Sequence, residues 1–412
     1  MKQQKRYLED VIKSLCFNTK NPKMAFIAGP RQAGKTTCAK HLLAERKNSY
    51  YHNWDDKTVR KIWAKDPKEL LTKKKAPKPL IIFDEIHKAK GWKRTLKGLY
   101  DTLTFPQDIV VTGSTKLNTY RKSSDSLMGR YYYFRLHPFS LSELTNLNHI
   151  LLPEQLTKKL LQTQAIPSTP KEIKTLEDLM TFGPFPEPYL AKSKQILQLW
   201  QMGRVDKVVN EELRDLSKLP ELNQISLLVS LLPERVGNPI SITTLRQDLE
   251  VAYTTIKRWL TYLEALYYHY EIKPYTHKIN RSLKKEGKLY LWDWSEVENE
   301  GSRFENLIAS HLFKYCDYLV DTGQSRAELR YVKTKEKKEL DFVVLNHKKP
   351  FLAIEVKLHD ESPSSNWKTL LPKLNLDFGI QVVKTPHIYQ RHIFPWGTIY
   401  VMSAEKLLKF LA

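Results

Sequence analysis

Short apolar runs alternate with amphipathic segments along the first 140 residues of the chain. The apolar runs lie at residues 24–28, 80–83, 109–111 and 131–136, and each has the length of a buried strand. Between them, stretches such as residues 36–46 and 95–103 carry apolar side chains at helical spacing. Alternating strands and helices predict a parallel sheet with helices on both faces, which is the α/β class.

The pattern changes beyond residue 150. Residues 151–175 are polar and contain three prolines, Pro153, Pro167 and Pro170, which predicts a connector. Residues 223–274 are mostly helical, and strands return at 339–345 and 351–358. We expect an α/β domain at 1–150, a linker and helical lid at 151–222, a winged helix at 223–298 and a second α/β domain at 299–412.

The composition is that of an ordinary globular protein. The 412 residues argue for two or three domains, with 41% hydrophobic and 27% charged residues. No apolar run approaches the roughly 20 residues of a membrane span, and the start, MKQQKRYLED, lacks the apolar centre of a secretory signal. The cysteines Cys16, Cys38 and Cys316 have no metal or disulfide spacing. These features predict a cytoplasmic protein without a membrane partner.

Basic residues strongly outnumber acidic ones. Lys plus Arg is 67 and Asp plus Glu is 45, which gives a net charge of +22. Such an excess attracts polyanions, of which nucleic acid is the commonest, although general solubility is the simpler alternative. Basic stretches at residues 73–78, 273–285 and 333–338 favour DNA contact by several modules.

A phosphate-binding loop follows the first apolar run. Residues 29–36 fit the pattern G-x-x-x-x-G-K-[ST] between a predicted strand and a predicted helix, which is the context that this motif requires. Lys35 would reach the β- and γ-phosphates of ATP, and the Thr36 hydroxyl would bind Mg²⁺. The candidate nucleotide-binding residues are Gly29, Pro30, Arg31, Gln32, Ala33, Gly34, Lys35, Thr36 and Thr37.

Two acids end the second apolar run. Asp84 would hold Mg²⁺, and Glu85 would orient and deprotonate the attacking water. A helix cap or a surface pair at a strand end is the alternative interpretation. Because the phosphate-binding loop lies upstream, we expect the catalytic pair.

Polar residues at the end of the third run suggest a sensor of the γ-phosphate. Ser114 or Thr112 is the candidate, and a plain turn at Gly113 is the alternative. Arg130 could enter a neighbouring subunit's site as an arginine finger, which would require a homo-oligomer. Arg31, inside the loop, could touch phosphate. A structural salt bridge is the alternative for each arginine.

The segments GPRQAGKTT, IIFDEIHK and GRYYYFRLHPFSLSE together resemble a known family. It is the family of AAA-type (ASCE P-loop) ATPases of bacteria and archaea with a C-terminal conserved region of unassigned function. The resemblance extends to residues 183–187 (GPFPE), 288–293 (KLYLWD), 304–306 (FEN) and 355–357 (EVK), and Pro184 stands where many members have a second glycine. It implies ATP binding on an ASCE-type core.

Residues 238–274 have the pattern of a winged helix-turn-helix. A first helix at 242–250, a turn at 251–253 and a recognition helix at 254–267 would share one small core. Its apolar residues are Leu245, Leu249, Ile256, Leu260 and Leu263. The candidate DNA contacts are Thr254, Thr255, Lys257 and Arg258, and the candidate wing carries Lys273, His277, Lys278, Arg281, Lys284 and Lys285. The alternative is a lid or a module that contacts protein.

Acids on two predicted C-terminal strands fit the D-(x)n-E-x-K arrangement of PD-(D/E)XK nucleases. Asp341 and Glu355 would hold Mg²⁺, and Lys357, on the same strand face as Glu355, would activate water. Glu305, on a predicted helix at 304–315, would be a fourth, metal-binding member. We expect a restriction-nuclease-like α/β domain, and such folds also occur as binding modules without cleavage.

These features predict an ATP-hydrolysing AAA-type ATPase that acts on DNA, with a Mg²⁺-dependent nuclease activity as a further expectation. The alternative is a nucleotide-dependent switch or scaffold that binds a protein partner and has a catalytically silent nuclease-like domain. A metabolic kinase would leave the winged helix and the basic excess without a role.

Overall fold

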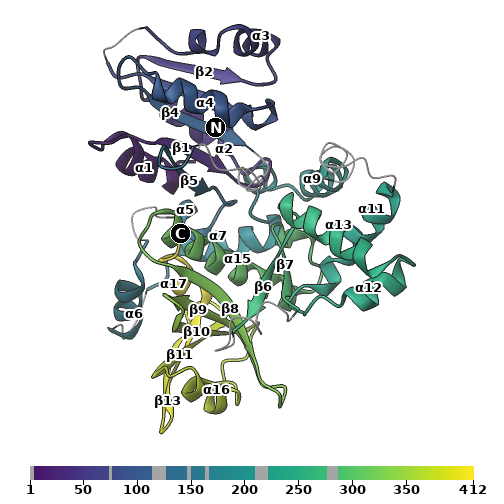
Figure 1. Ribbon diagram of the computed structural model, residues 1–412. Helices are drawn as coiled ribbons and strands as arrows, with labels where there is room; N and C mark the ends of the chain where they lie inside the picture. The colour runs from purple at the N-terminus through teal and green to yellow at the C-terminus, as the bar shows by residue number, and fades with distance from the viewer. Residues whose placement is uncertain are drawn as a thin grey trace. The chain divides into compact units, whose positions relative to one another are not determined.

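The computed structural model describes residues 4–73, 77–113, 127–145, 150–162, 167–208, 221–275 and 286–412. The chain divides into two compact units, Met1–Pro138 and Phe139–Ala412, and Figure 1 labels their elements. The sequence predicts the first boundary at residue 150. The structure divides the chain earlier because α5 (Leu141–Thr145) packs against α7 (Pro170–Phe182). In the described part of the chain, no helix is long and apolar enough to cross a membrane.

The first unit is built on a five-stranded parallel sheet. Its strands are β1 (Met24–Ala28), β2 (Ser49–Asn53), β3 (Leu80–Asp84), β4 (Asp108–Gly113) and β5 (Tyr131–Arg135). They lie in the order β2-β3-β4-β1-β5, and every neighbouring pair is parallel. β4 therefore lies between the strand before the phosphate-binding loop and the strand that ends at Asp84. The predicted α/β sheet is confirmed.

Helices flank this sheet. They are α1 (Tyr7–Ile12), α2 (Lys35–Ala44), α3 (Lys57–Lys65) and α4 (Trp92–Asp101). Every residue of β1, β3 and β4 is buried, which explains why these strands are continuous apolar runs in the sequence. The edge strand β2 is only partly buried, and its sequence SYYHN did not predict a strand.

The second unit combines helices with an eight-stranded mixed sheet. The helices not yet named are α6 (Pro153–Gln162), α8 (Pro186–Ala191), α9 (Lys194–Asp206), α11 (Leu222–Leu231), α12 (Ile242–Asp248), α13 (Tyr253–Ala265), α15 (Glu300–Asp321), α16 (Trp367–Lys373) and α17 (Ala404–Leu408). The strands are β6 (His269–Pro274), β7 (Lys288–Leu291), β8 (Ala327–Lys333), β9 (Glu339–Asn346), β10 (Lys349–Lys357), β11 (Phe378–Val383), β12 (Tyr389–Phe394) and β13 (Gly397–Ser403). Their order is β12-β13-β11-β10-β9-β8-β6-β7.

One hydrophobic cluster joins the helices of this unit to its sheet. It extends from Phe139 to Leu411 and includes the buried face of α15, which contacts β7, β8 and β10. The antiparallel pair β6–β7 follows α13 and joins the sheet through the parallel contact of β6 with β8. The predicted winged-helix segment and the predicted C-terminal domain therefore share a sheet as well as a core.

Two helices begin within residues 151–175, the segment predicted to be a polar connector at the start of the linker and helical lid. Helix α6 begins at Pro153, and α7 begins at Pro170. Proline is favoured at the first helical position because the amide hydrogen that it lacks would have no partner there. Thr169 and Glu172 close a capping box before α7, so that these prolines start helices rather than separate them.

Candidate functional site

The predicted phosphate-binding loop forms a tight turn between β1 and α2. Gly29 and Gly34 have φ angles of +148° and +95°, and Gln32 also has a positive φ of 61°. A Cβ atom on Gly29 would lie 2.3 Å from the carbonyl oxygen of Leu136. The loop therefore requires glycine at this position both for its φ angle and for its closeness to the backbone.

Lys35 lies across this loop. Its Nζ donates hydrogen bonds to the carbonyl oxygens of Gly29, at 3.0 Å, and Pro30, at 2.7 Å. The side chain is buried at the first residue of α2, where the positive end of a helix favours anions. The ammonium group therefore already lies in the loop, where it could contact a bound phosphate.

Asp84 connects the loop to the sheet. Its Oδ2 accepts hydrogen bonds from the Thr36 hydroxyl, at 3.0 Å, and from the Tyr51 hydroxyl, at 2.5 Å. Its Oδ1 accepts one from Thr112. The structure thus brings Thr36, Asp84 and Thr112 together, as the sequence predicts. It also adds Tyr51, which lies on the strand that the sequence did not predict.

Glu85 follows Asp84 in a left-handed backbone conformation, with a φ of 57°. Its N–H donates to the carbonyl of Thr112 at 3.1 Å, which fixes its position at the sheet edge. Burial raises the pKa of its carboxyl, and the ammonium of Lys35 opposes this shift. The His87 Nε2 lies 3.7 Å from Glu85 Oε2, and burial lowers the pKa of this histidine to about 4.

The other predicted loop and arginine positions have different outcomes. Pro30, Ala33 and the partly buried Arg31 lie within the loop, and Thr37 is exposed on α2. Ser114 lies outside the described residues. Arg130 forms a two-point ion pair with Asp101, with Nε 2.6 Å from Oδ1 and Nη2 3.0 Å from Oδ2. This is the salt bridge that the sequence left as an alternative, and a role in a neighbouring subunit stays a prediction.

Arg6 is a loop contact that sequence reasoning missed. Its guanidinium donates to the carbonyl oxygens of Ala33, at 2.6 Å, and His137, at 2.5 Å. Arg6 is 3% exposed, although it lies in the strongly charged start of the chain. A buried arginine beside the loop restrains its backbone from the side of α1.

The helical module contains the two helices that the sequence predicts, with ends that differ by at most two residues. Helices α12 and α13 occupy the positions of the two predicted helices, and the five predicted core residues are all buried. Thr254, Lys257 and Arg258 are exposed on the first turns of α13, and Thr255 is partly buried. Arg258 Nη2 lies 3.8 Å from Glu221 Oε2. In the candidate wing, Lys273 forms an ion pair with Glu271. The other wing residues fall within residues 276–285, outside the described part of the chain.

The acids predicted for the C-terminal site lie together. Glu305 comes from α15, Asp341 from β9, and Glu355 and Lys357 from β10. Lys357 Nζ lies 2.9 Å from Glu355 Oε1, and Asp341 Oδ2 accepts from the N–H of Val356 at 2.8 Å. Burial, together with the charge of Asp341, raises the pKa of Glu305 and of Glu355 to about 7.

Lys288, at the start of β7, is the member of this cluster that sequence reasoning missed. Its Nζ lies 2.5 Å from Glu339 Oε1, 3.5 Å from Glu305 Oε1 and 3.6 Å from Asp341 Oδ1. Tyr290 also donates to Glu305 Oε1, at 2.7 Å. Within the described ranges, no three His, Cys, Asp or Glu side chains are arranged to hold a metal ion. Glu305, Asp341 and Glu355, the acids predicted to bind Mg²⁺ in this domain, therefore lie close together, with Lys288 beside Glu305 and Asp341, but they do not form such a group in the described residues.

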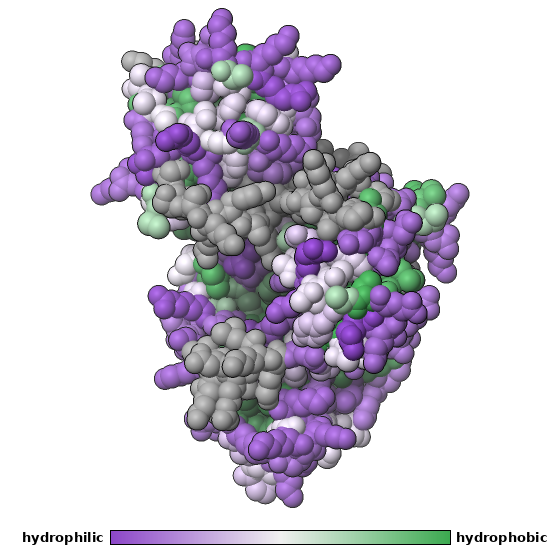
Figure 2. Space-filling model, turned by 45° about the vertical axis from the view of Figure 1, so that its right-hand side comes forward, coloured by the Kyte–Doolittle hydropathy of each residue, from purple (hydrophilic) through white to green (hydrophobic). Residues whose placement is uncertain are grey.

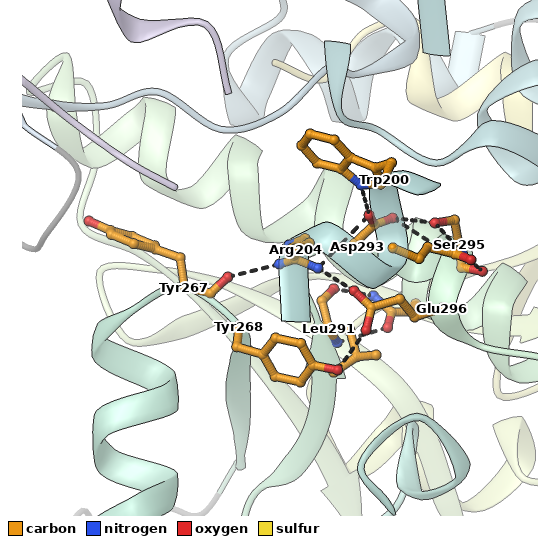
Figure 3. A network of polar contacts seen from close by, with 10 residues as sticks. Trp200, Arg204, Tyr267, Tyr268, Leu291, Asp293, Ser295 and Glu296 are labelled. Atoms are coloured by element: carbon orange, nitrogen blue, oxygen red, sulfur yellow. Dashed lines mark hydrogen bonds and ion pairs between the residues drawn. The ribbon is translucent and has the colours of Figure 1, made fainter. Parts of the chain in front are cut away.

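A second polar cluster joins two segments that are far apart in the sequence. In Figure 3, Arg204 of α9 lies between Asp293 and Glu296, which follow β7. Arg204 Nη1 is 2.5 Å from Glu296 Oε1 and 3.9 Å from Asp293 Oδ2. Trp200 Nε1 donates to Asp293 at 2.9 Å, and a Cβ on Gly183 would lie 2.6 Å from Asp293 Oδ1. Residues 183–187 and 288–293 therefore meet as structural neighbours.

Comparison with known proteins divides the chain into three regions. Residues 21–145 match the family described as AAA domain. Residues 173–296 match a domain of unknown function, DUF8612, and residues 300–402 match another, DUF4143. An uncharacterized protein of Haemophilus influenzae is 23% identical over 343 residues, which cover 77% of this chain and 78% of that protein.

Two solved structures show a weak overall likeness. The ORC1 protein of Aeropyrum pernix in complex with DNA is 13% identical, with a TM-score of 0.31, over 73% of this chain and 90% of that one. A mutant RuvB of Thermotoga maritima is 17% identical, with a TM-score of 0.29, over 68% and 93%. The match at residues 21–145 is therefore the basis for assigning the first unit.

Proposed function

We propose, from the AAA-type P-loop ATPase domain that residues 21–145 form, that the protein binds and hydrolyses ATP and uses this reaction to act on DNA. The observation that carries the proposal is the meeting of four side chains at one end of a parallel sheet, namely Lys35, Thr36, Asp84 and Glu85. These are the residue types that phosphoryl transfer to water uses in P-loop ATPases, and their closeness supports the proposal.

Different side chains of the site would have different roles in hydrolysis. Lys35 would exchange the two loop carbonyls for phosphate oxygens, and Thr112 and Tyr51 would hold the Asp84 carboxylate in place. Thr36 Oγ1 and Asp84 Oδ2, 3.0 Å apart, are oxygen ligands that suit Mg²⁺, which would shield the charge of the phosphates when bound. Glu85 would take a proton from the attacking water, a role that its raised pKa favours.

DNA contact is proposed for the winged-helix module at residues 223–298. The exposed first turns of α13 carry Thr254, Lys257 and Arg258, and the net charge of the whole chain is +22. An exposed basic helix start after a helix-turn is the geometry by which such modules enter the major groove. Attraction to phosphates would supply most of the affinity.

For residues 299–412 we propose a nuclease-like domain that binds DNA without cutting it. The closeness of Glu305, Asp341, Glu355 and Lys357 supports the nuclease-like part of this proposal. Lys288 lies among these carboxylates, and the described arrangement is not a metal site. Mg²⁺-dependent cleavage is therefore not part of the proposal.

The alternative function is a nucleotide-dependent switch that binds a protein partner. It is favoured by apolar side chains exposed on neighbouring turns of α9, with Leu199 62% and Met202 69% exposed, and by Leu227 of α11, 50% exposed. The face turned forward in Figure 2 shows such apolar side chains in green among hydrophilic ones. A protein partner would cover this surface.

Two measurements test the proposal. Lys35→Ala should abolish ATP hydrolysis, and Glu85→Gln should keep ATP binding while it slows hydrolysis about 10²-fold or more. Lys47→Ala, an exposed position beyond α2, is the matched control. Duplex DNA affinity should fall by about 10³–10⁵ between 50 and 200 mM salt if some 6–10 phosphates are contacted. ATP hydrolysis without duplex binding at 50 mM salt would instead support the protein-binding switch.

A further inference from the structure

We propose that Lys288 is a built-in counter-ion that keeps divalent metal ions out of the carboxylate cluster formed by Glu305, Glu339, Asp341 and Glu355. The inference concerns the second unit alone and goes beyond the proposed function. It depends on neither ATP hydrolysis nor DNA binding.

The position of the ammonium group carries the inference. Lys288 Nζ lies within 3.6 Å of oxygens from three carboxylates, at Glu339, Glu305 and Asp341. The residue is 2% exposed, so that water cannot screen these contacts. A buried ammonium with three acidic neighbours neutralises charge that would otherwise attract a metal ion.

Several of the carboxylate oxygens that a metal would need are already engaged. Glu305 Oε1 accepts from Tyr290, and Asp341 Oδ2 accepts from the backbone N–H of Val356. Glu355 Oε1 pairs with Lys357, whereas Glu355 Oε2 is buried and has no hydrogen-bond partner among the described residues. A metal ion at this cluster would have to displace or share these contacts, and Mg²⁺ and Mn²⁺ require several oxygen ligands.

The cation and the acids come from different elements. Lys288 belongs to β7, which pairs with β6, whereas Glu305 lies on α15 and the other acids lie on β9 and β10. The start of β7 is fixed by the bond from Leu289 N to Asn238 O, at 3.0 Å, and by the bond from Ile240 N to Gly287 O, at 3.1 Å. These backbone hydrogen bonds hold Lys288 in position beside the carboxylates. Repulsion between its ammonium group and a metal ion in the same space would cost a large electrostatic energy.

Manganese binding to the full-length protein tests the inference without any measurement of catalysis. Isothermal titration with Mn²⁺ alone compares the wild type, Lys288→Met, Glu355→Gln and the double variant. Lys288→Met should gain one Mn²⁺ site with affinity at least about tenfold above any site at this cluster in the wild type. Adding Glu355→Gln to this variant should remove that site. Any Mn²⁺ bound near Asp84 is the same in all four proteins, so it does not affect the differences between them.

The control is Lys333→Met, which removes an exposed lysine that contacts Glu339 at 2.7 Å from the other side. It should gain no Mn²⁺ site. A Lys288→Met protein that binds Mn²⁺ like the wild type would overturn the proposal. If this variant does not fold, the wild type still decides: Mn²⁺ binding that Glu355→Gln removes from the wild type contradicts the proposal, and binding that this change leaves intact supports it.

Discussion

The backbone of Gly29 touches the carbonyl group of Leu136. A Cβ atom on Gly29 would lie 2.3 Å from that oxygen, and the N–H of Leu136 donates to the carbonyl of Ala28 at 2.8 Å. The residue after β5 is thus held against both the end of β1 and the loop that follows it. The atom in the way is backbone, so the clash cannot be relieved by rotating a side chain.

Gly29→Ala should therefore distort the phosphate-binding loop. We expect ATP to bind at least about tenfold more weakly and the domain to lose about 2 kcal/mol of stability, because strain at a positive φ adds to the clash. Calorimetry and thermal unfolding measure the two effects. Gly98→Ala is the control, since among the described residues outside the helix's own backbone no atom lies within 4 Å of a Cβ in the middle of α4. A variant that binds ATP like the wild type would show that the loop tolerates the change.

Arg204 should be a major determinant of stability in the second unit. Arg204→Met removes the cation between Asp293 and Glu296 and leaves both carboxylates buried. An uncompensated buried charge costs about 3–5 kcal/mol. Urea unfolding of the variant should show a loss of this order.

The comparison for Arg204 is an ion pair at the surface. Arg235 Nη2 lies 2.7 Å from Asp248 Oδ2 in a partly exposed position. Arg235→Met should cost at most about 1 kcal/mol, because water screens the pair. If both variants lost the same free energy of unfolding, burial of the Arg204 ion pairs would contribute nothing to stability.

His311 should make the second unit sensitive to acid. Its Nε2 accepts a hydrogen bond from the N–H of Leu141 at 3.0 Å, which requires the neutral ring, and burial lowers its pKa to about 4. The unfolded chain binds a proton near pH 6.5, so stability is complete above that pH and falls as the pH decreases towards 4. From pH 7 to pH 5 this group alone removes about 2 kcal/mol.

Urea unfolding at pH 7 and pH 5 checks the His311 prediction. His311→Gln keeps an acceptor for Leu141 but does not titrate in this range. The loss of stability between the two pH values should be smaller in this variant than in the wild type by about the same 2 kcal/mol. An unchanged pH dependence would mean that another group is responsible.

Elements that depend mainly on contiguous residues could be predicted from the sequence. Examples are the strand at 24–28, the loop at 29–36 and the helices within residues 242–267, since each has its full pattern within one short segment. Strand β2 could not be predicted, since SYYHN is half-buried at a sheet edge and is ordered by its pairing with β3. Helix α6 could not be predicted from Pro153, because proline breaks a helix when it lies in its interior but favours a helix when it is the first residue.

The nucleotide site and the C-terminal carboxylate cluster also differ in how far the sequence predicts them. The candidate nucleotide site depends mainly on residues in two short motifs, and the structure brings Thr36 and Asp84 together. The C-terminal cluster depends on a contact between segments far apart in the sequence. Lys288 looks like an ordinary strand residue in KLYLWD, and only the sheet order, which places β7 at one edge and joins it to β8 through β6, brings it near Glu339 and Glu305.

Lys257 and Arg258 should contribute to DNA affinity through phosphates. The double change Lys257→Glu and Arg258→Glu reverses two exposed charges on α13. If each residue contacts one phosphate, the slope of log affinity against log salt should become shallower by about 2, and binding should weaken for all duplex sequences. Fluorescence anisotropy with labelled duplex at several salt concentrations measures both effects.

A matched control separates this contact from a general change of charge. Lys338→Glu would disturb an internal bond to Thr369, so the better controls are Lys368 of α16 and Lys158 of α6, both exposed. The double change Lys368→Glu and Lys158→Glu alters the net charge equally but should leave the slope nearly unchanged, because long-range attraction is screened within about 10 Å at 0.1 M salt. Equal weakening by both double variants would show that DNA senses only the overall charge and that α13 is not its contact surface.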